Sequence, residues 1–423
     1  MVKTVLNKKF TSDSLITISA LIIIGLCGLL INLIIQNNFN KEGLGIFSYI
    51  FSIFFIIVSV GTFGMNRAMV YFSAYYFDRK KYRNQLITNS ILLIITWSSL
   101  LLITIQIGLV TFANNFFTNE QNIYLKIISY AVPFYCVNNV GIAVLNGLRR
   151  MKIYSFLRSL RWISLILCLV VLSSYQLLKF VFYSFIISEI IIFIILVYIF
   201  FKSKYIQGFY IKNCLIEILS YIKYVFPSQI LVSLNENIDI ILLENYLSEG
   251  GLGVYSFSSK IAKSLGLIGN AIQTNFNPII SSHFKNNSIA ELKQLCFQLR
   301  RTCLKIFSFL IFFIGLIYFC TLQFFIDDVS YKEVFNFYIL QSLGAGLYAA
   351  FAWAGGMLIM TGKIKENINR TLFKLFFNMI LLLSCINIFP SEIGAYIGFT
   401  LFMISQLIID REFIYKYLRI KIF

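Results

Sequence analysis

Runs of about 20 apolar residues recur along the whole chain, and each is long enough to cross the ~30 Å hydrocarbon core of a bilayer as a helix. Hydrophobic residues make up 59% of the 423 positions, mean hydropathy is +0.81, and charged residues are only 13%. These values predict an all-α polytopic membrane protein. The first run, 14–36, is too long for a signal-peptide core and has no small-x-small cleavage site after it, so we expect it to be retained.

Twelve spans are expected. Their approximate bounds are 14–36, 46–65, 86–112, 123–147, 160–175, 178–201, 222–243, 253–280, 303–325, 334–360, 371–389 and 393–410.

Lysine and arginine are sorted between the two sides of these spans. The N-terminal segment, alternate loops and the C-terminal tail together hold 30 of the 36, and the opposite loops hold Lys41, Lys126, Lys179 and Lys332. The positive-inside rule therefore predicts an even number of spans in the cytoplasmic (inner) membrane, with both termini cytoplasmic. This sorting also explains the net charge of +18 without a nucleic-acid partner.

A short motif occurs twice. Residues 42–49 read EGLGIFSY and residues 250–257 read GGLGVYSF, an offset of 208 that is about half the chain. Each copy follows one apolar run and opens the next. The motif predicts two six-helix lobes, 1–201 and 217–410, joined by a cytoplasmic linker at 202–216 and followed by a tail at 411–423. Because six spans preserve orientation, the lobes are parallel repeats related by an axis along the membrane normal.

Four charged residues lie inside the seventh and eighth predicted spans, although their counterparts in the first half are uncharged. Isolated at mid-helix, each costs roughly 2.5–3.5 kcal/mol to insert. The acids are three residues apart, as are the lysines, so each pair shares one helix face. Glu236 and Lys260 are about equally far from the turn of the hairpin and should lie at similar depth. We expect the acids to face the lysines, either as an interhelical ion pair or as the lining of a water-filled binding cavity. The four are Glu236, Asp239, Lys260 and Lys263.

The same hairpin resembles the O-antigen and polysaccharide flippases of the multidrug/oligosaccharidyl-lipid/polysaccharide (MOP) exporter superfamily. The positions that match are Pro227, Asp239, Gly253, Tyr255, Ser256 and Lys260. The resemblance implies a MATE-like fold with a central cavity. It also implies a transporter, not an enzyme, that moves a polyprenyl-pyrophosphate-linked oligosaccharide outward by alternating access, with a glycan polymerase and assembly machinery as possible partners.

Such a cargo needs cations for its diphosphate and polar side chains for its sugars. Lys260 and Lys263 are candidates deep in the membrane, and Arg67 and the pair 149–150 lie near cytoplasmic helix ends. Arg67 and that pair also fit a purely orienting role. Sugar-binding candidates, for which helix–helix hydrogen bonding is the alternative, are Asn138, Asn139, Asn270, Gln273 and Asn275.

An ion gradient is the expected energy source, because the sequence has no nucleotide-binding motif. Asp239 and Glu236 qualify as carriers of H⁺ or Na⁺ by position, but a permanent lysine partner would hold either one ionised. Glu189 has no basic residue within ten positions except Lys179, so an isolated acid that exchanges a proton is expected there; a structural hydrogen bond is the alternative. No cofactor or metal is expected, since the eight cysteines form no C-x-x-C pair and His283 is the single histidine.

Two other classes remain. One is a multidrug exporter of the same superfamily, or a major-facilitator carrier. The other is a membrane glycan polymerase or glycosyltransferase, against which the short predicted external loops argue.

Overall fold

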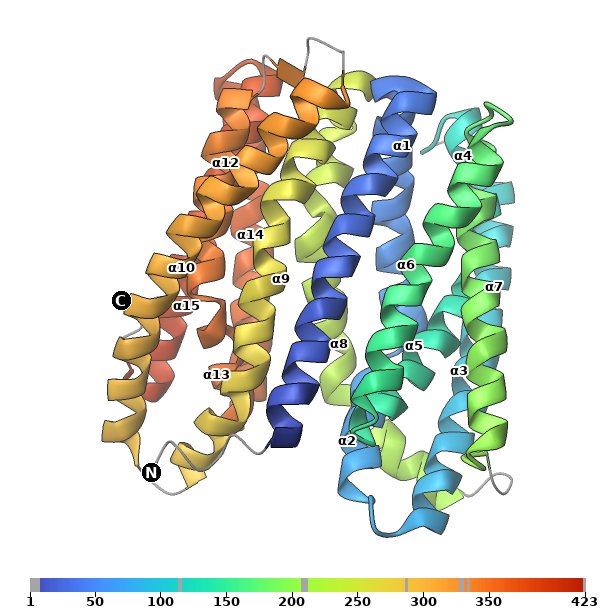
Figure 1. The fold of residues 1–423 in the computed structure, drawn as a ribbon, viewed down its shortest axis with the longest axis vertical. Coiled ribbons are helices and arrows are strands. Elements are labelled where there is room, and N and C mark those ends of the chain that lie inside the picture. Colours follow the sequence, from blue (N-terminus) through green and yellow to red (C-terminus); the bar gives the residue numbers. More distant parts are fainter. Residues whose placement is uncertain are drawn as a thin grey trace. The chain divides into compact units, whose positions relative to one another are not determined.

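The structure, a computed structural model, describes residues 8–112, 116–206, 212–285, 288–326, 331–332 and 335–420. Its regular structure in these ranges is helical (Figure 1). The first helices are α1 (Lys8–Gly61), α2 (Met65–Tyr75), α3 (Lys80–Thr111), α4 (Asn119–Ser129), α5 (Val132–Gly147), α6 (Met151–Ser173) and α7 (Lys179–Lys202). The others are α8 (Lys212–Leu243), α9 (Glu249–Lys285), α10 (Ile289–Phe324), α12 (Phe335–Ala350), η3 (Ala352–Gly356), α13 (Met357–Met360), α14 (Ile364–Ile388) and α15 (Ser391–Leu418).

Eight helices within the described ranges are long and apolar enough to cross a membrane, or up to ten if each of two bent helix pairs counts as one span. The helix α1 counts once in that number, although it joins two predicted spans across a break at Asn40, where φ is 57°. The helix α9 is not among them, because lysines, serines and asparagines lower its hydropathy. The predicted number of twelve requires that α1 count twice and that α9 also cross the membrane, so it stays a prediction.

The chain forms two compact units. Unit 1 comprises Met1–Asn38 and Ile50–Ser233, and unit 2 comprises Phe39–Tyr49 and Leu234–Phe423. Both α1 and α8 therefore contribute to both units. The two units are defined by which residues lie close together in space. The predicted lobes 1–201 and 217–410 are defined by the sequence repeat instead, so their boundaries stay a prediction.

Unit 1 is built around α5, which packs against α2, α3, α6 and α7. Pro133 lies in the first turn of α5, where a backbone N–H would have no partner within the helix, so proline fits there without loss of a hydrogen bond. The axis turns by 44° between α4 and α5, as expected from a proline in that span. The first part of α8 joins this unit through Gln229, whose amide donates to the Thr62 hydroxyl at 2.7 Å.

Unit 2 is built around α12, which packs against α9, α10 and α15, while α14 packs along α15. Figure 1 shows these five helices as the yellow-to-red part of the ribbon. The small residue Gly346 lets α12 approach its neighbours: a Cβ there would lie 3.5 Å from Leu265 of α9 and would overlap Ile311 of α10. After α12 the chain bends by 49° into η3 and α13, so this predicted span is broken.

The two copies of the repeated motif pack directly against each other in unit 2. A methyl group on Gly45 would overlap the Glu249 carbonyl, and one on Gly253 would overlap the Lys41 carbonyl. The hydroxyls of Ser48 and Ser256, which occupy the same place in the two copies, are 2.8 Å apart. Each contact is thus repeated with the offset of 208, as a local two-fold relation requires. The motif recurs because both helices need a small residue where their backbones cross at close range.

Candidate functional site

Asp239 on α8 and Lys263 on α9 form an ion pair inside unit 2. Lys263 Nζ lies 2.8 Å from Asp239 Oδ2 and also donates to the Glu236 backbone carbonyl at 3.0 Å. The Tyr255 hydroxyl donates to the same carboxylate oxygen at 3.0 Å. The Asp239 side chain is 3% exposed and that of Lys263 is 25% exposed. The acid is therefore enclosed, while the ammonium group retains an open side.

The helical periodicity explains how both α9 residues reach one acid. Tyr255 and Lys263 are eight positions apart, which is slightly more than two turns, so they share one face of α9. The hairpin of α8 and α9 turns at 244–248, which places that face against Asp239. The expected equal depth concerned Glu236 and Lys260, whereas the observed pair joins Asp239, close to the turn, to Lys263, farther from it.

Lys260 makes a different contact from the one expected. Its Nζ donates to the Ser48 hydroxyl at 2.9 Å and lies 5.3 Å from the centre of the Phe47 ring. Lys260 is one turn beyond Ser256, so it points to the crossing of the two repeated motifs. The Glu236 residue is exposed, and its backbone carbonyl accepts the bond from Lys263. A cavity lined by all four side chains stays a prediction.

Glu189 on α7 is not isolated, contrary to the expectation. Arg161 on α6 places its Nε 3.0 Å from Glu189 Oε1, and the Asn138 amide donates to Oε2 at 2.8 Å. The Glu189 side chain is fully buried and that of Arg161 is 10% exposed. Arg161 lies 28 positions from Glu189 in the sequence but on the adjacent helix, so residues near Glu189 in the sequence do not reveal this partner. The reason for choosing Glu189 as a proton carrier therefore does not hold.

The other predicted residues are divided between the two units. Arg67 is exposed on α2, and Asn139 accepts a bond from Arg161 at 2.9 Å. Asn270 is exposed on α9, and the Gln273 amide packs against Gly355 of η3. The last two belong to unit 2, whereas Arg67 and Asn139 belong to unit 1. Of the remaining candidates, Arg150 donates to Ser203 at 3.1 Å, and the Asn275 side chain lies outside the described residues.

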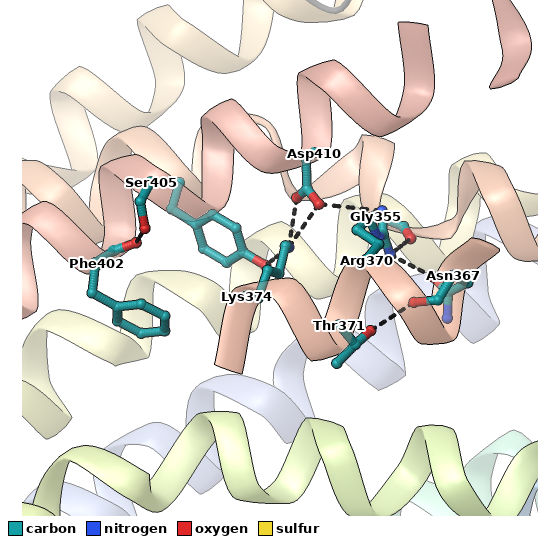
Figure 2. A network of polar contacts seen from close by, with 9 residues as sticks. Gly355, Asn367, Arg370, Thr371, Lys374, Phe402, Ser405 and Asp410 are labelled. Atoms are coloured by element: carbon teal, nitrogen blue, oxygen red, sulfur yellow. Dashed lines mark hydrogen bonds and ion pairs between the residues drawn. The ribbon is translucent and has the colours of Figure 1, made fainter. Parts of the chain in front are cut away.

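A third charged network was not predicted. Asp410 on α15 accepts from Lys374 on α14 at 2.7 and 2.8 Å, and Arg370 Nη1 lies 3.3 Å from the same carboxylate (Figure 2). The Arg370 Nη2 donates to the Gly355 carbonyl at 2.8 Å and to the Asn367 amide oxygen at 2.6 Å. All three charged side chains are 6–7% exposed. The sequence could have indicated this network, because Arg370 and Lys374 lie near the start of one predicted span and Asp410 lies at the end of the next.

Residues 10–284 match the family model described as "Polysaccharide biosynthesis protein". The chain belongs to this family. None of the curated proteins matches the sequence. The family comprises membrane transporters of the MOP superfamily, so the resemblance stated from the α8–α9 residues is confirmed.

Solved structures of MATE transporters share the fold of this family member. An inward-facing multidrug resistance MATE transporter of the MOP superfamily superposes with a TM-score of 0.73 at 15% identity, over 94% of this chain and 97% of that one. The MATE multidrug transporter DinF-BH gives 0.70 at 17% identity, over 99% and 97%. The transporter VcmN of Vibrio cholerae gives 0.70 at 12% identity, over 97% of each chain. The predicted all-α MATE-like membrane fold is therefore confirmed.

Proposed function

We propose that this polysaccharide-family protein is a flippase for a polyprenyl-pyrophosphate-linked oligosaccharide, such as an O-antigen or capsule repeat unit. It acts in the cytoplasmic membrane, with both termini in the cytoplasm, and is not an enzyme. The observation that carries the proposal is the match of residues 10–284 to the polysaccharide biosynthesis family. A multidrug transporter is the alternative with the same fold, but structural neighbours below 20% identity support the fold and not the cargo.

The balance of membrane charge also favours an anionic cargo. The three ion-paired networks within the described residues contain four cations, Arg161, Lys263, Arg370 and Lys374, and three acids, Asp239, Glu189 and Asp410. A net positive charge in a low-dielectric environment attracts a diphosphate and repels a cationic drug. This surplus distinguishes the flippase from an exporter of lipophilic cations.

Lys263 is the residue best placed to meet the cargo. Asp239 and the Glu236 carbonyl hold its ammonium group in one orientation, while a quarter of the side chain stays exposed. A phosphate oxygen reaching that open side adds a charge-assisted hydrogen bond. If the α8–α9 hairpin moves during transport, Lys263 binds the phosphate more strongly in one of the inward-open and outward-open states than in the other. Alternating access requires such a difference in affinity between the two states.

We further propose that an ion gradient drives the transport. Asp239 is the carboxylate in contact with the cargo-binding lysine, so H⁺ or Na⁺ that binds Asp239 competes with Lys263 for the same oxygen. Release of the lysine by the incoming ion then couples ion entry to cargo binding. Ion flux that depends on cargo and is lost in Asp239→Asn vesicles supports this coupling; unchanged flux contradicts it.

Replacing Lys263 with glutamine is expected to reduce surface glycan at least tenfold in a complementation assay. Cells lacking the gene are supplied with each variant, and surface glycan and membrane-inserted protein are measured together. The matched control is Lys223→Gln, which removes an exposed charge from the first part of α8. Normal glycan with the Lys263 variant removes Lys263 from the mechanism. Normal glycan in the deletion strain without any supplied gene contradicts the flippase function itself.

A further inference from the structure

The Asp410 network has a counterpart in the first half of the chain. Arg161 and Glu189 lie on α6 and α7, and Arg370 and Asp410 lie on α14 and α15, which are the last two spans of each half. Both networks also touch the bent span that precedes them, through Asn138 on α5 and through the Gly355 carbonyl of η3. An arginine–carboxylate pair is therefore a repeated structural linkage in this fold.

The Asp410 network contains one more cation than the Arg161–Glu189 pair. Arg161 and Glu189 balance one to one, whereas Arg370 and Lys374 share Asp410 alone. Because Lys374 is as buried as its partners, water screens its charge only weakly. A buried surplus charge is unfavourable unless an opposite charge joins it. The network therefore favours the binding of an anion.

Unused hydrogen-bond donors gather on the same elements. Buried donors without an acceptor are the Arg370 Nε group, the Trp353 indole N–H of η3 and the Asn378 amide of α14. Arg370 Nη2 is already fixed by Gly355 and Asn367, so its guanidinium plane is held in place (Figure 2). Phosphate oxygens only accept hydrogen bonds, and the planar guanidinium fits them better than any other side chain.

The position of the network suits a ligand from the inner leaflet. Arg370 lies six residues into α14, which corresponds to roughly 9 Å of helix from the connection at 361–363. The positive-inside sorting predicts that this connection is cytoplasmic. Gln273, predicted to bind sugar, packs against Gly355, and its Nε2 lies 3.0 Å from the place of a Cβ there. A sugar-binding candidate and the cations thus meet at η3.

We propose that Arg370 and Lys374, together with the η3 break, form a phosphate-binding site that receives the diphosphate of the cargo from the cytoplasmic side. The site is separate from Lys263 and Asp239, and it rests on the proposed flippase function. Asp410 bridges the two cations and balances one of their charges, and the diphosphate supplies the missing negative charge on binding. Arg161 and Glu189 remain a structural linkage without such a role.

Binding to the full-length protein in nanodiscs of zwitterionic lipid tests this site. Inorganic pyrophosphate is titrated while tryptophan fluorescence is recorded, and thermal stability is measured with and without it. Lys374→Gln is expected to weaken binding tenfold or more and yet fold, because the Arg370–Asp410 pair then resembles the pair in the first half. Lys374→Arg is expected to retain binding. The matched control, Lys365→Gln, removes an exposed charge from the same helix and is expected to bind like the wild type.

A carboxylate variant separates binding from a purely structural network. Asp410→Asn enlarges the positive surplus, so pyrophosphate is expected to raise its melting temperature more than that of the wild type. Equal pyrophosphate binding by the wild type and Lys374→Gln, or no binding by either, overturns the site. The flippase function stands in that event if the complementation assay is positive.

The source of the phosphate is distinguished by two further nanodisc preparations. One contains a sugar-free polyprenyl pyrophosphate, and the other contains phosphatidylglycerol at the same mole fraction. Displacement of inorganic pyrophosphate by the polyprenyl pyrophosphate alone supports a cargo site. Equal displacement by phosphatidylglycerol shows a general lipid-headgroup site and overturns its assignment to the cargo.

Discussion

Replacing Glu189 with leucine is expected to lower the free energy of unfolding by about 3–5 kcal/mol, because the Arg161 guanidinium then stays buried without its carboxylate. The two groups are 3.0 Å apart, and the Glu189 side chain is fully buried. The loss is measured by thermal or chemical unfolding in detergent micelles. It is expected to lower the amount of membrane-inserted protein as well, so transport assays on this variant require correction for protein amount.

The double variant Arg161→Met with Glu189→Leu is the control for that result. Removing both charges leaves no uncompensated ion, so most of the lost stability is expected to return. Export by a stable double variant assigns the pair to structure alone. Additive losses in the two single variants and the double variant contradict the account of the pair as one linkage.

Replacing Gly253 with alanine is expected to destabilise the protein by about 1–3 kcal/mol, since a methyl group there overlaps the Lys41 carbonyl. The two repeated motifs must then separate, which also breaks the 2.8 Å contact between Ser48 and Ser256. We expect surface glycan to fall with stability, because Lys260 donates to the same Ser48 hydroxyl. Melting temperature and complementation are measured on the same variant.

Gly266→Ala is the matched control for this substitution. Gly266 lies on the same helix, and a Cβ there meets nothing within 4 Å. Its melting temperature is expected to stay near that of the wild type. Equal effects at Gly253 and Gly266 would show that helix propensity, and not the close crossing, decides the outcome.

The features predicted correctly from the sequence depend on periodicity and on register along the chain. Apolar runs fix the helices, and the offset of 208 identifies two motifs that turn out to touch at Ser48 and Ser256. An acid on α8 was expected to face a lysine on α9, and Asp239 and Lys263 do so, but distance from the turn did not identify this particular pair.

The features that were missed depend on contacts between helices that are distant in sequence. Arg161 and Lys374 lie at the first turns of the predicted spans 160–175 and 371–389, so the charge sorting counted them with the cytoplasmic loops. In the structure α6 and α14 begin earlier, at Met151 and Ile364, and these residues are buried against α7 and α15. The predicted spans begin near these charges, at residues 160 and 371, whereas the helices begin 9 and 7 residues earlier.

Transport in reconstituted vesicles tests the central claim most directly. The purified full-length protein is placed in vesicles with a polyprenyl-pyrophosphate-linked oligosaccharide carrying a fluorescent sugar, and an impermeant reagent quenches the label on the outer leaflet. The account predicts that label moves between leaflets in wild-type vesicles under an imposed proton or sodium gradient, and at least tenfold more slowly in Lys263→Gln vesicles. Movement no faster than in protein-free vesicles under either gradient, with a fluorescent lipophilic cation exported instead, would contradict it.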